Sequence, residues 1–461
     1  MADHHVIIGG GPAATNAIDT IRQFDGGESK ITIICDEPTH SRMALPYWLA
    51  GSIPREQTYT GDEKYFASKG VETKFGARVT AIDSGANSVT LDNGETITYD
   101  KLLIATGSTP LAPPIPGTDL PGVQPLWTLA HTEAVLQATA AIEKPRVVLV
   151  GAGFIGFIML NAMYKKGWDL TVVEREEQVL PRMLNGSAAA IVQDWLARRG
   201  VGVFTGVNVE AIHENDGAKS VQLSNGENLD ADIVIIATGV QPNVELAQAA
   251  GLETDHGILV NDSMQTSVSN IYAAGDCAQG AVLLSDKREV HAIQPTAVDH
   301  GRVAGANMAG QSVAYPGSLI MNVVDVCGLQ CASYGNWEDT SGGDTSIDNP
   351  AGHIYRQYLW NGGQMVGAIF LGRPNDMGML TDVGMVKGII QTMTDLGQWK
   401  NYLNDNPFDI RRAYIGAGVA QKLIGYTLVG KPTPSRDYRY NNTKVEVPAN
   451  KAHSVYIADS K

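Results

Sequence analysis

Two glycine-rich loops are the residues of this sequence whose types and spacing most directly imply chemistry. Gly9–Ala14 reads GGGPAA after the apolar run Val6–Ile8, and Gly151–Gly156 reads GAGFIG after Val147–Val150. In such a loop the first glycine makes a tight turn, the second lets the backbone approach a pyrophosphate, and the third position lets helix and strand pack closely. The following helix N-terminus then faces the phosphate charge. One such loop is weak evidence, but two predict two dinucleotide sites.

Both loops occupy the same place in a longer repeat. Asp36 follows Gly9 by 27 residues and Glu174 follows Gly151 by 23, near the spacing of about 20 typical of a carboxylate that accepts hydrogen bonds from a ribose. An Asn-Gly pair occurs at 93–94 and again at 225–226, and an Ala-Thr-Gly strand end at 105–107 and again at 237–239, all with the same offset of 132 residues. The Asn-Gly pairs predict hairpin turns with positive φ at both central residues.

Three further segments resemble the FAD-dependent pyridine nucleotide-disulfide oxidoreductases, the two-dinucleotide-binding flavoproteins. Asn270–Asp276 is similar to the family's second FAD segment, whose aspartate binds the ribityl chain. Gln294–Thr296 begins a helix pattern that faces the flavin pyrimidine ring in that family. Ser41–Gly51, SRMALPYWLAG, resembles a segment of ferredoxin reductases and of the flavin module of NADH-dependent nitrite reductase. The resemblance covers roughly residues 5–400.

This resemblance implies FAD and NAD(H) as cofactors. The residues expected to bind FAD are Gly9, Gly11, Pro12, Ala13, Ala14, Asp36, Arg42, Ala105, Thr106, Gly107, Gly275, Asp276, Gln294, Pro295 and Thr296. Those expected to bind NAD are Gly151, Gly153, Phe154, Ile155, Gly156, Glu174, Ala237, Thr238 and Gly239.

The implied fold class is α/β, with two Rossmann-like dinucleotide-binding domains and a C-terminal α+β interface domain. The FAD domain is expected at residues 1–111 and 241–316, the NAD domain at 112–240, and the interface domain at 317–430. Residues 431–461 show neither helical nor sustained strand periodicity, and we expect an extended tail. Its local charge is positive, and it is either a solvated tail or an arm that docks on a partner subunit.

The sequence lacks the groups on which several relatives depend. No cysteine lies in the helix beginning near Pro12, and Met43 lies near the position of a single redox cysteine, so disulfide reduction is disfavoured. Cys327 and Cys331 align with apolar residues and are expected to be structural. A lysine and a glutamate that relatives pair beside the flavin align with Tyr47 and Ile158. These two residues are either ordinary packing residues or flavin-proximal.

Composition excludes other classes of function. A net charge of −15 disfavours nucleic-acid binding. The most apolar segment, residues 147–163, is too short and too interrupted by glycine for a membrane span. Four scattered cysteines fit a reducing, cytoplasmic compartment, and the histidines have no zinc-like spacing, so no metal site is expected.

A flavin and dinucleotide framework without a disulfide relay favours an NADH:acceptor oxidoreductase of the ferredoxin-NAD reductase type. Its expected partner is an iron-sulfur protein or subunit, with the chain in a homodimer or a hetero-oligomeric complex. The alternatives are an NADH oxidase or diaphorase that uses oxygen, and a scaffold subunit with structural FAD.

Overall fold

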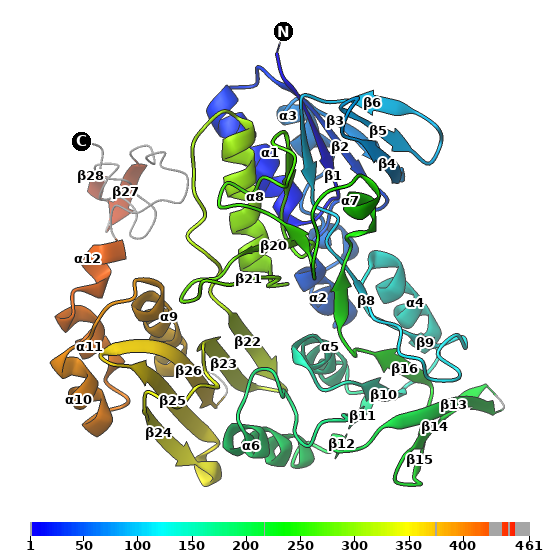
Figure 1. The fold of residues 1–461 in the computed structure, drawn as a ribbon. Helices are drawn as coiled ribbons and strands as arrows, with labels where there is room; N and C mark the ends of the chain where they lie inside the picture. The colour runs from blue at the N-terminus through cyan, green and yellow to red at the C-terminus, as the bar shows by residue number, and fades with distance from the viewer. Residues whose placement is uncertain (1, 216, 374–375, 424–435, 441–442, 448–461) are drawn as a thin grey trace.

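The computed structural model describes residues 2–215, 217–373, 376–423, 436–440 and 443–447. Within these residues, three five-stranded sheets carry helices of their own (Figure 1). Two of the sheets are parallel and the third is antiparallel. The predicted α/β class, with two Rossmann-like units and a C-terminal α+β unit, is confirmed.

The first parallel sheet has the strand order β19-β7-β1-β2-β3. Its strands β19, β7, β1 and β2 read as nearly continuous apolar runs because they are buried, as is typical of parallel sheets, whereas β3 is largely exposed. Helices α1 and α8 lie side by side against it (Figure 1). They approach so closely that a Cβ on Gly301 would lie 2.2 Å from the Ala13 carbonyl oxygen. The elements are β1 (His4–Ile8), α1 (Pro12–Asp25), β2 (Lys30–Cys35), β3 (Val71–Phe75), β7 (Lys101–Ile104), β19 (Ile271–Ala273) and α8 (Gln294–Met308).

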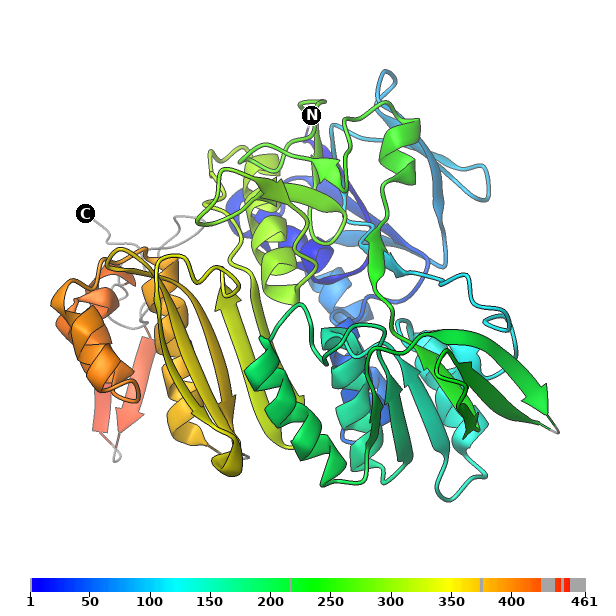
Figure 2. The ribbon, with the colours of Figure 1, turned by 60° about the horizontal axis from the view of Figure 1, so that its bottom comes forward.

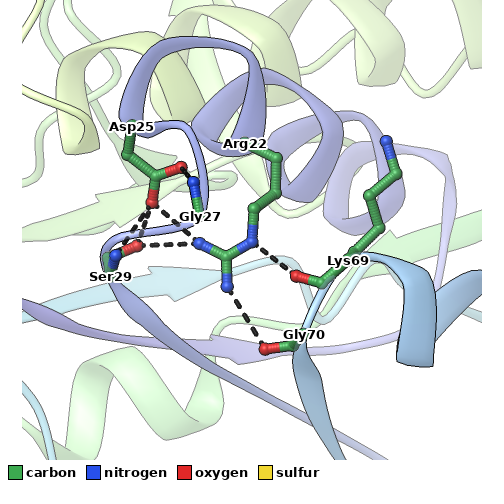
Figure 3. Close-up of polar contacts among 6 residues, drawn as sticks. All are labelled: Arg22, Asp25, Gly27, Ser29, Lys69 and Gly70. Carbon is green, nitrogen blue, oxygen red and sulfur yellow. Dashed lines mark hydrogen bonds and ion pairs between the residues drawn. The ribbon is translucent and has the colours of Figure 1, made fainter.

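The end of α1 is fixed to its sheet by Arg22 (Figure 3). The Arg22 guanidinium donates to the Lys69 carbonyl at 2.6 Å, to the Asp25 carboxylate at 2.7 Å and to Ser29 at 3.0 Å. Arg22 therefore joins the turn after α1 to the turn before β3. Both turns lie where the parallel strands begin, at the end of the sheet opposite the glycine loop.

The second parallel sheet has the order β12-β11-β10-β16-β9 and repeats this design. The chain enters and leaves this unit through β8 and β17, which pair antiparallel. The elements are β8 (Ser108–Pro110), β9 (Val123–Gln124), α4 (Leu129–Thr139), β10 (Arg146–Val150), α5 (Phe154–Lys165), β11 (Asp169–Val173), α6 (Gly186–Ala197), β12 (Gly202–Phe204), β16 (Ile233–Ile236) and β17 (Val240–Pro242).

The antiparallel sheet, of order β22-β23-β26-β25-β24, lies beside α6 of the second unit (Figure 2). The Trp195 indole N–H donates to the Val326 carbonyl at 3.0 Å, and residues of both units form one hydrophobic cluster. The elements are β22 (Met321–Val326), β23 (Leu329–Gly335), β24 (Asp344–Asn349), β25 (Ile354–Asn361), β26 (Gln364–Gly372), α9 (Met377–Gln391), α10 (Gln398–Asp405), α11 (Ile410–Gly416) and α12 (Val419–Leu423).

Smaller elements, most of them in the first two units, complete the fold. They are α2 (Leu45–Leu49), α3 (Glu63–Ser68), α7 (Glu245–Ala249), β4 (Val79–Asp83), β5 (Ser88–Leu91), β6 (Thr96–Thr98), β13 (Val209–Asn215), β14 (Ala218–Leu223), β15 (Asn228–Ala231), β18 (Ile258–Leu259), β20 (Ala278–Ala281) and β21 (Arg288–Glu289), with short 3-10 turns at Arg42–Ala44, Arg55–Thr58 and Pro350–Gly352.

Two sequence expectations about turns and tail need correction. Both Asn-Gly pairs form hairpins, but within each pair only the glycine, Gly94 or Gly226, has positive φ, and the asparagine does not. The loops are three-residue turns with the glycine in the left-handed region, so the predicted double positive φ is wrong. In the predicted unstructured tail, β27 (Arg436–Tyr440) pairs with β28 (Thr443–Val447). The rest of residues 431–461 lies outside the described residues, and the domain boundaries remain predictions.

Candidate dinucleotide and flavin site

One cavity of about 370 Å³ collects most of the predicted FAD residues and is called the central cavity below. Its wall comes from the carboxyl ends of β1, β2 and β7, from the starts of α1, α5 and α8, and from β22. In doubly wound folds ligands bind at this edge of the sheet. The predicted FAD residues in its wall are Gly9, Gly11, Pro12, Ala13, Asp36, Arg42, Ala105, Thr106, Gly107, Gly275, Asp276, Gln294 and Pro295. Ala14 and Thr296 are buried beside it and do not line it.

The first glycine loop has the conformation that a diphosphate requires. Gly9 has φ +109°, and a Cβ there would lie 2.1 Å from the Ala105 carbonyl oxygen. Nothing lies within 4 Å of where a Gly11 Cβ would be, so the loop backbone is open on the cavity side. No side chain caps α1, whose N-cap is Gly11. The helix N-terminus is thereby left to a ligand, and the loop fits the diphosphate of FAD.

Arg42 adds a positive charge to the same wall. Its guanidinium lies 4.6 Å from the centroid of the Trp127 ring. Among the described residues it makes no ion pair, although burial lowers its pKa and the nearby Asp276, Glu37 and Asp36 oppose that shift. A partly buried guanidinium without a carboxylate partner favours an anionic ligand, which is a second observation that fits FAD.

Three further predicted FAD residues, Asp276, Asp36 and Gln294, already have partners within the protein. Asp276 accepts a hydrogen bond from the Ser108 hydroxyl at 2.8 Å, which fixes its side chain beside the cavity. Asp36 lies 2.6 Å from Arg78, and both side chains are exposed. Gln294 begins α8 and accepts from the Ser41 hydroxyl at 3.2 Å. The predicted helix start at Gln294 is confirmed, whereas the ribose contact of Asp36 stays a prediction.

The second glycine loop repeats the geometry of the first. Gly151 has φ +104°, and a Cβ there would lie 2.4 Å from the Ala237 carbonyl oxygen. The space beside Gly153 is open within 4 Å, while a Cβ on Gly156 would lie 2.6 Å from the Gly151 carbonyl oxygen. Phe154 and Ile155 begin α5 and reach the central cavity, whereas Gly151, Gly153, Gly156, Glu174, Ala237, Thr238 and Gly239 do not line it.

Glu174 takes a position that the sequence did not reveal. The side chain is buried at 7% exposure. Its carboxylate accepts the N–H of Ala152 at 2.7 Å and the N–H of Glu176 at 3.0 Å. Glu174 therefore clamps the second glycine loop, and a ribose hydroxyl would have to share these oxygens.

Tyr47 and Ile158, the two residues that align with the lysine and glutamate of relatives, lie in different surroundings. Ile158, on α5, lines the central cavity together with Leu45 and Pro46. Tyr47 is 56% exposed and lies outside the cavity wall. No lysine lines this cavity, so the wall near Ile158 is apolar, and a flavin-proximal role of Tyr47 stays a prediction.

All four cysteines are buried and free of disulfides. Burial raises the pKa of Cys35 and of Cys327 to about 12, and it raises the pKa of Cys277 and Cys331 as well. Cys35 does line the cavity, but its sulfur lies against Gly10 of the first glycine loop. A thiol protonated in this way is a poor nucleophile.

Sequence reasoning missed part of the cavity wall. The neighbours of predicted residues that it missed are Glu37, His40, Met159 and Ile293, and the residues from distant segments are Leu126, Trp127, Met321 and Val323. In the described part of the chain, no group of three His, Cys, Asp or Glu residues could hold a metal ion. Over the same residues no helix has the length and apolar character to cross a membrane.

Known proteins of similar sequence indicate the same cofactors. The family model described as pyridine nucleotide-disulphide oxidoreductase matches residues 3–301. The NADH-dependent phenylglyoxylate dehydrogenase subunit epsilon of Aromatoleum evansii is 30% identical over 88% of this chain and 96% of its own. An NADH oxidase of Methanocaldococcus jannaschii is 35% identical over 68% of this chain and 71% of its own.

A solved structure, the covalent putidaredoxin reductase-putidaredoxin complex, contains a chain that matches 91% of this chain and 100% of its own, with a TM-score of 0.81 and 26% identity. The relatives are NAD(P)H-dependent flavoprotein oxidoreductases, and the glycine loops and the unpaired Arg42 fit their cofactors, FAD and NAD(P)H. This chain belongs to the pyridine nucleotide-disulphide oxidoreductase family.

Proposed function

We propose that this chain oxidises NADH and passes the electrons through FAD to an iron-sulfur protein, either a ferredoxin-type carrier or an iron-sulfur subunit of a larger oxidoreductase. The observation that carries the proposal is a complete FAD and dinucleotide framework in which every cysteine is buried. Bound FAD supplies the chemistry that such an adapter needs, because it takes a hydride from NADH and can give up electrons one at a time.

The chain's own residues bind and orient the two cofactors. The first glycine loop, Arg42 and Asp276 hold FAD, with the N-terminus of α8 directed at the cavity. The second glycine loop, shaped by Glu174, holds the nucleotide. Ile158 and Met159, on the helix that follows the second glycine loop, give the central cavity an apolar wall.

Two relatives support a protein as the electron acceptor. The Aromatoleum evansii protein is named as a subunit of a dehydrogenase, and the putidaredoxin reductase chain was solved in a covalent complex with putidaredoxin. The subunit name also supports a hetero-oligomeric complex for this chain, and a homodimer stays the alternative prediction. A cytoplasmic location stays a prediction.

A second candidate is an NADH oxidase, which the name of the Methanocaldococcus jannaschii relative favours. The two functions separate when FAD-loaded protein is given NADH in air, with and without a ferredoxin or the copurifying iron-sulfur protein. Our proposal expects slow oxygen consumption and fast reduction of the carrier. Rapid oxygen consumption that a carrier does not suppress, with no carrier reduction, would make the oxidase the better assignment.

A further inference from the structure

Trp127 connects two groups of the FAD site although it belongs to neither predicted FAD segment. It lies between β9 and α4, in the part of the chain expected to bind NAD, and it lines the central cavity. Its ring face and its indole N–H each contact a residue of the FAD unit.

The ring face holds Arg42. The guanidinium carbon lies 4.6 Å from the ring centroid, which is within the distance at which a cation is attracted to an indole. Arg42 has no ion pair among the described residues, and the Trp127 ring face is its one cation–π contact there. A flat ring on one side restricts the guanidinium to a plane from which it can meet an anion in the cavity.

The indole N–H holds the strand that orients Asp276. It donates to the Ser108 carbonyl at 2.9 Å, and the Ser108 hydroxyl in turn donates to the Asp276 carboxylate at 2.8 Å. Ser108 is buried. One side chain thus restrains both Arg42 and the residue that hydrogen-bonds Asp276.

We propose that Trp127 is a positioning residue for FAD: its ring holds the Arg42 guanidinium in the cavity wall, and its N–H holds Ser108 and through it Asp276. Because the ring comes from the other unit, FAD retention depends on the contact between the two units at this point. The proposal concerns FAD binding and does not depend on the identity of the electron acceptor.

The test measures the FAD dissociation constant by titrating the apoprotein of two variants, Trp127→Phe and Trp127→Met. Each variant is made once with the natural Arg42 and once together with Arg42→Leu. Phe keeps a ring face and loses the N–H, whereas Met fills the space without a ring. With Arg42 present, we expect the Met variant to bind FAD about fivefold more weakly than the Phe variant. With Arg42→Leu, that ratio should fall to about one.

Trp48 provides the matched control, since its ring lies 5.7 Å from Arg55 and outside the central cavity. Trp48→Met should leave the FAD dissociation constant unchanged. If the Phe and Met variants bind FAD as tightly as the natural protein, or if their ratio is the same with Arg42→Leu, the proposal is overturned. Should the Met variant not fold, Trp127→Phe still tests the Ser108 connection, because unaltered FAD binding would refute it.

Discussion

Replacing Glu174 by Gln tests how the second glycine loop is held in its binding conformation. The buried Glu174 carboxylate accepts one N–H from Ala152, inside the loop, and one from Glu176. Gln has nearly the same size but exchanges one acceptor oxygen for an NH2 group, so one of these N–H groups would face a donor. A buried donor left unpaired costs about 1–3 kcal/mol.

Since Ala152 lies between Gly151 and Gly153, we expect this cost to weaken NADH binding about 5- to 150-fold. Losing the negative charge should also narrow the preference for NADH over NADPH, because Glu174 no longer repels a 2′-phosphate. The assay is anaerobic rapid mixing with NADH or NADPH, followed by the loss of flavin absorbance, which gives a dissociation constant for each nucleotide. FAD content should not change.

Glu176→Gln is the control, because the Glu176 side chain is exposed and, within the described residues, its one ion pair is with the exposed Arg175. It should leave both dissociation constants within about twofold of the natural protein. If Glu174→Gln behaves in the same way, Glu174 neither shapes the loop nor selects the nucleotide. A natural protein with higher kcat/KM for NADPH would contradict the predicted preference itself.

Other predictions concern FAD, the two loops and acid stability. Asp276→Ala should lose FAD while the NADH-binding unit stays intact, and Ser108→Ala should cause a smaller loss; an Asp276→Ala protein purified with full FAD would contradict the assignment. Open space lies beside both Gly11 and Gly153, so a valine there would fit the protein but would occupy the place of the bound diphosphate. Gly11→Val should therefore empty the FAD site, as measured by flavin absorbance, and Gly153→Val should weaken NADH binding alone, as measured by nucleotide titration. Burial lowers the pKa of His300 to about 3. Below about pH 6.5 the unfolded chain therefore binds a proton that the folded chain does not, and stability falls by up to about 1.4 kcal/mol per pH unit. His300→Phe should reduce the slope measured by urea unfolding, while His5, whose pKa burial also lowers, keeps its own contribution; an unchanged slope would refute the role of His300.

The glycine loops could be predicted because their function is local. Positive φ at Gly9 and Gly151 and close strand approach follow from a short spacing of residue types, which the sequence displays directly. The start of α8 at Gln294 was predictable for the same reason, since Pro295 is compatible only with the first turn of a helix.

Tertiary contacts explain what could not be predicted. Trp127 and Val323 reach the cavity from segments far along the chain, and no local pattern marks them. Glu174 has the expected spacing, but its burial against the loop backbone appears only when β11 and the loop are assembled. The pairing of β27 with β28 was missed although Tyr438 and Tyr440, and Val445 and Val447, alternate with charged residues, because each alternating run spans only four residues.

The most direct test of the central claim is an anaerobic single-turnover experiment. FAD-loaded protein is reduced with one equivalent of NADH, mixed with an oxidised iron-sulfur protein, and followed at wavelengths where flavin and iron-sulfur cluster absorb separately. We expect the flavin to be reoxidised as two equivalents of a one-electron carrier are reduced, without any change at the four buried thiols. A flavin that stays reduced until oxygen is admitted would contradict it.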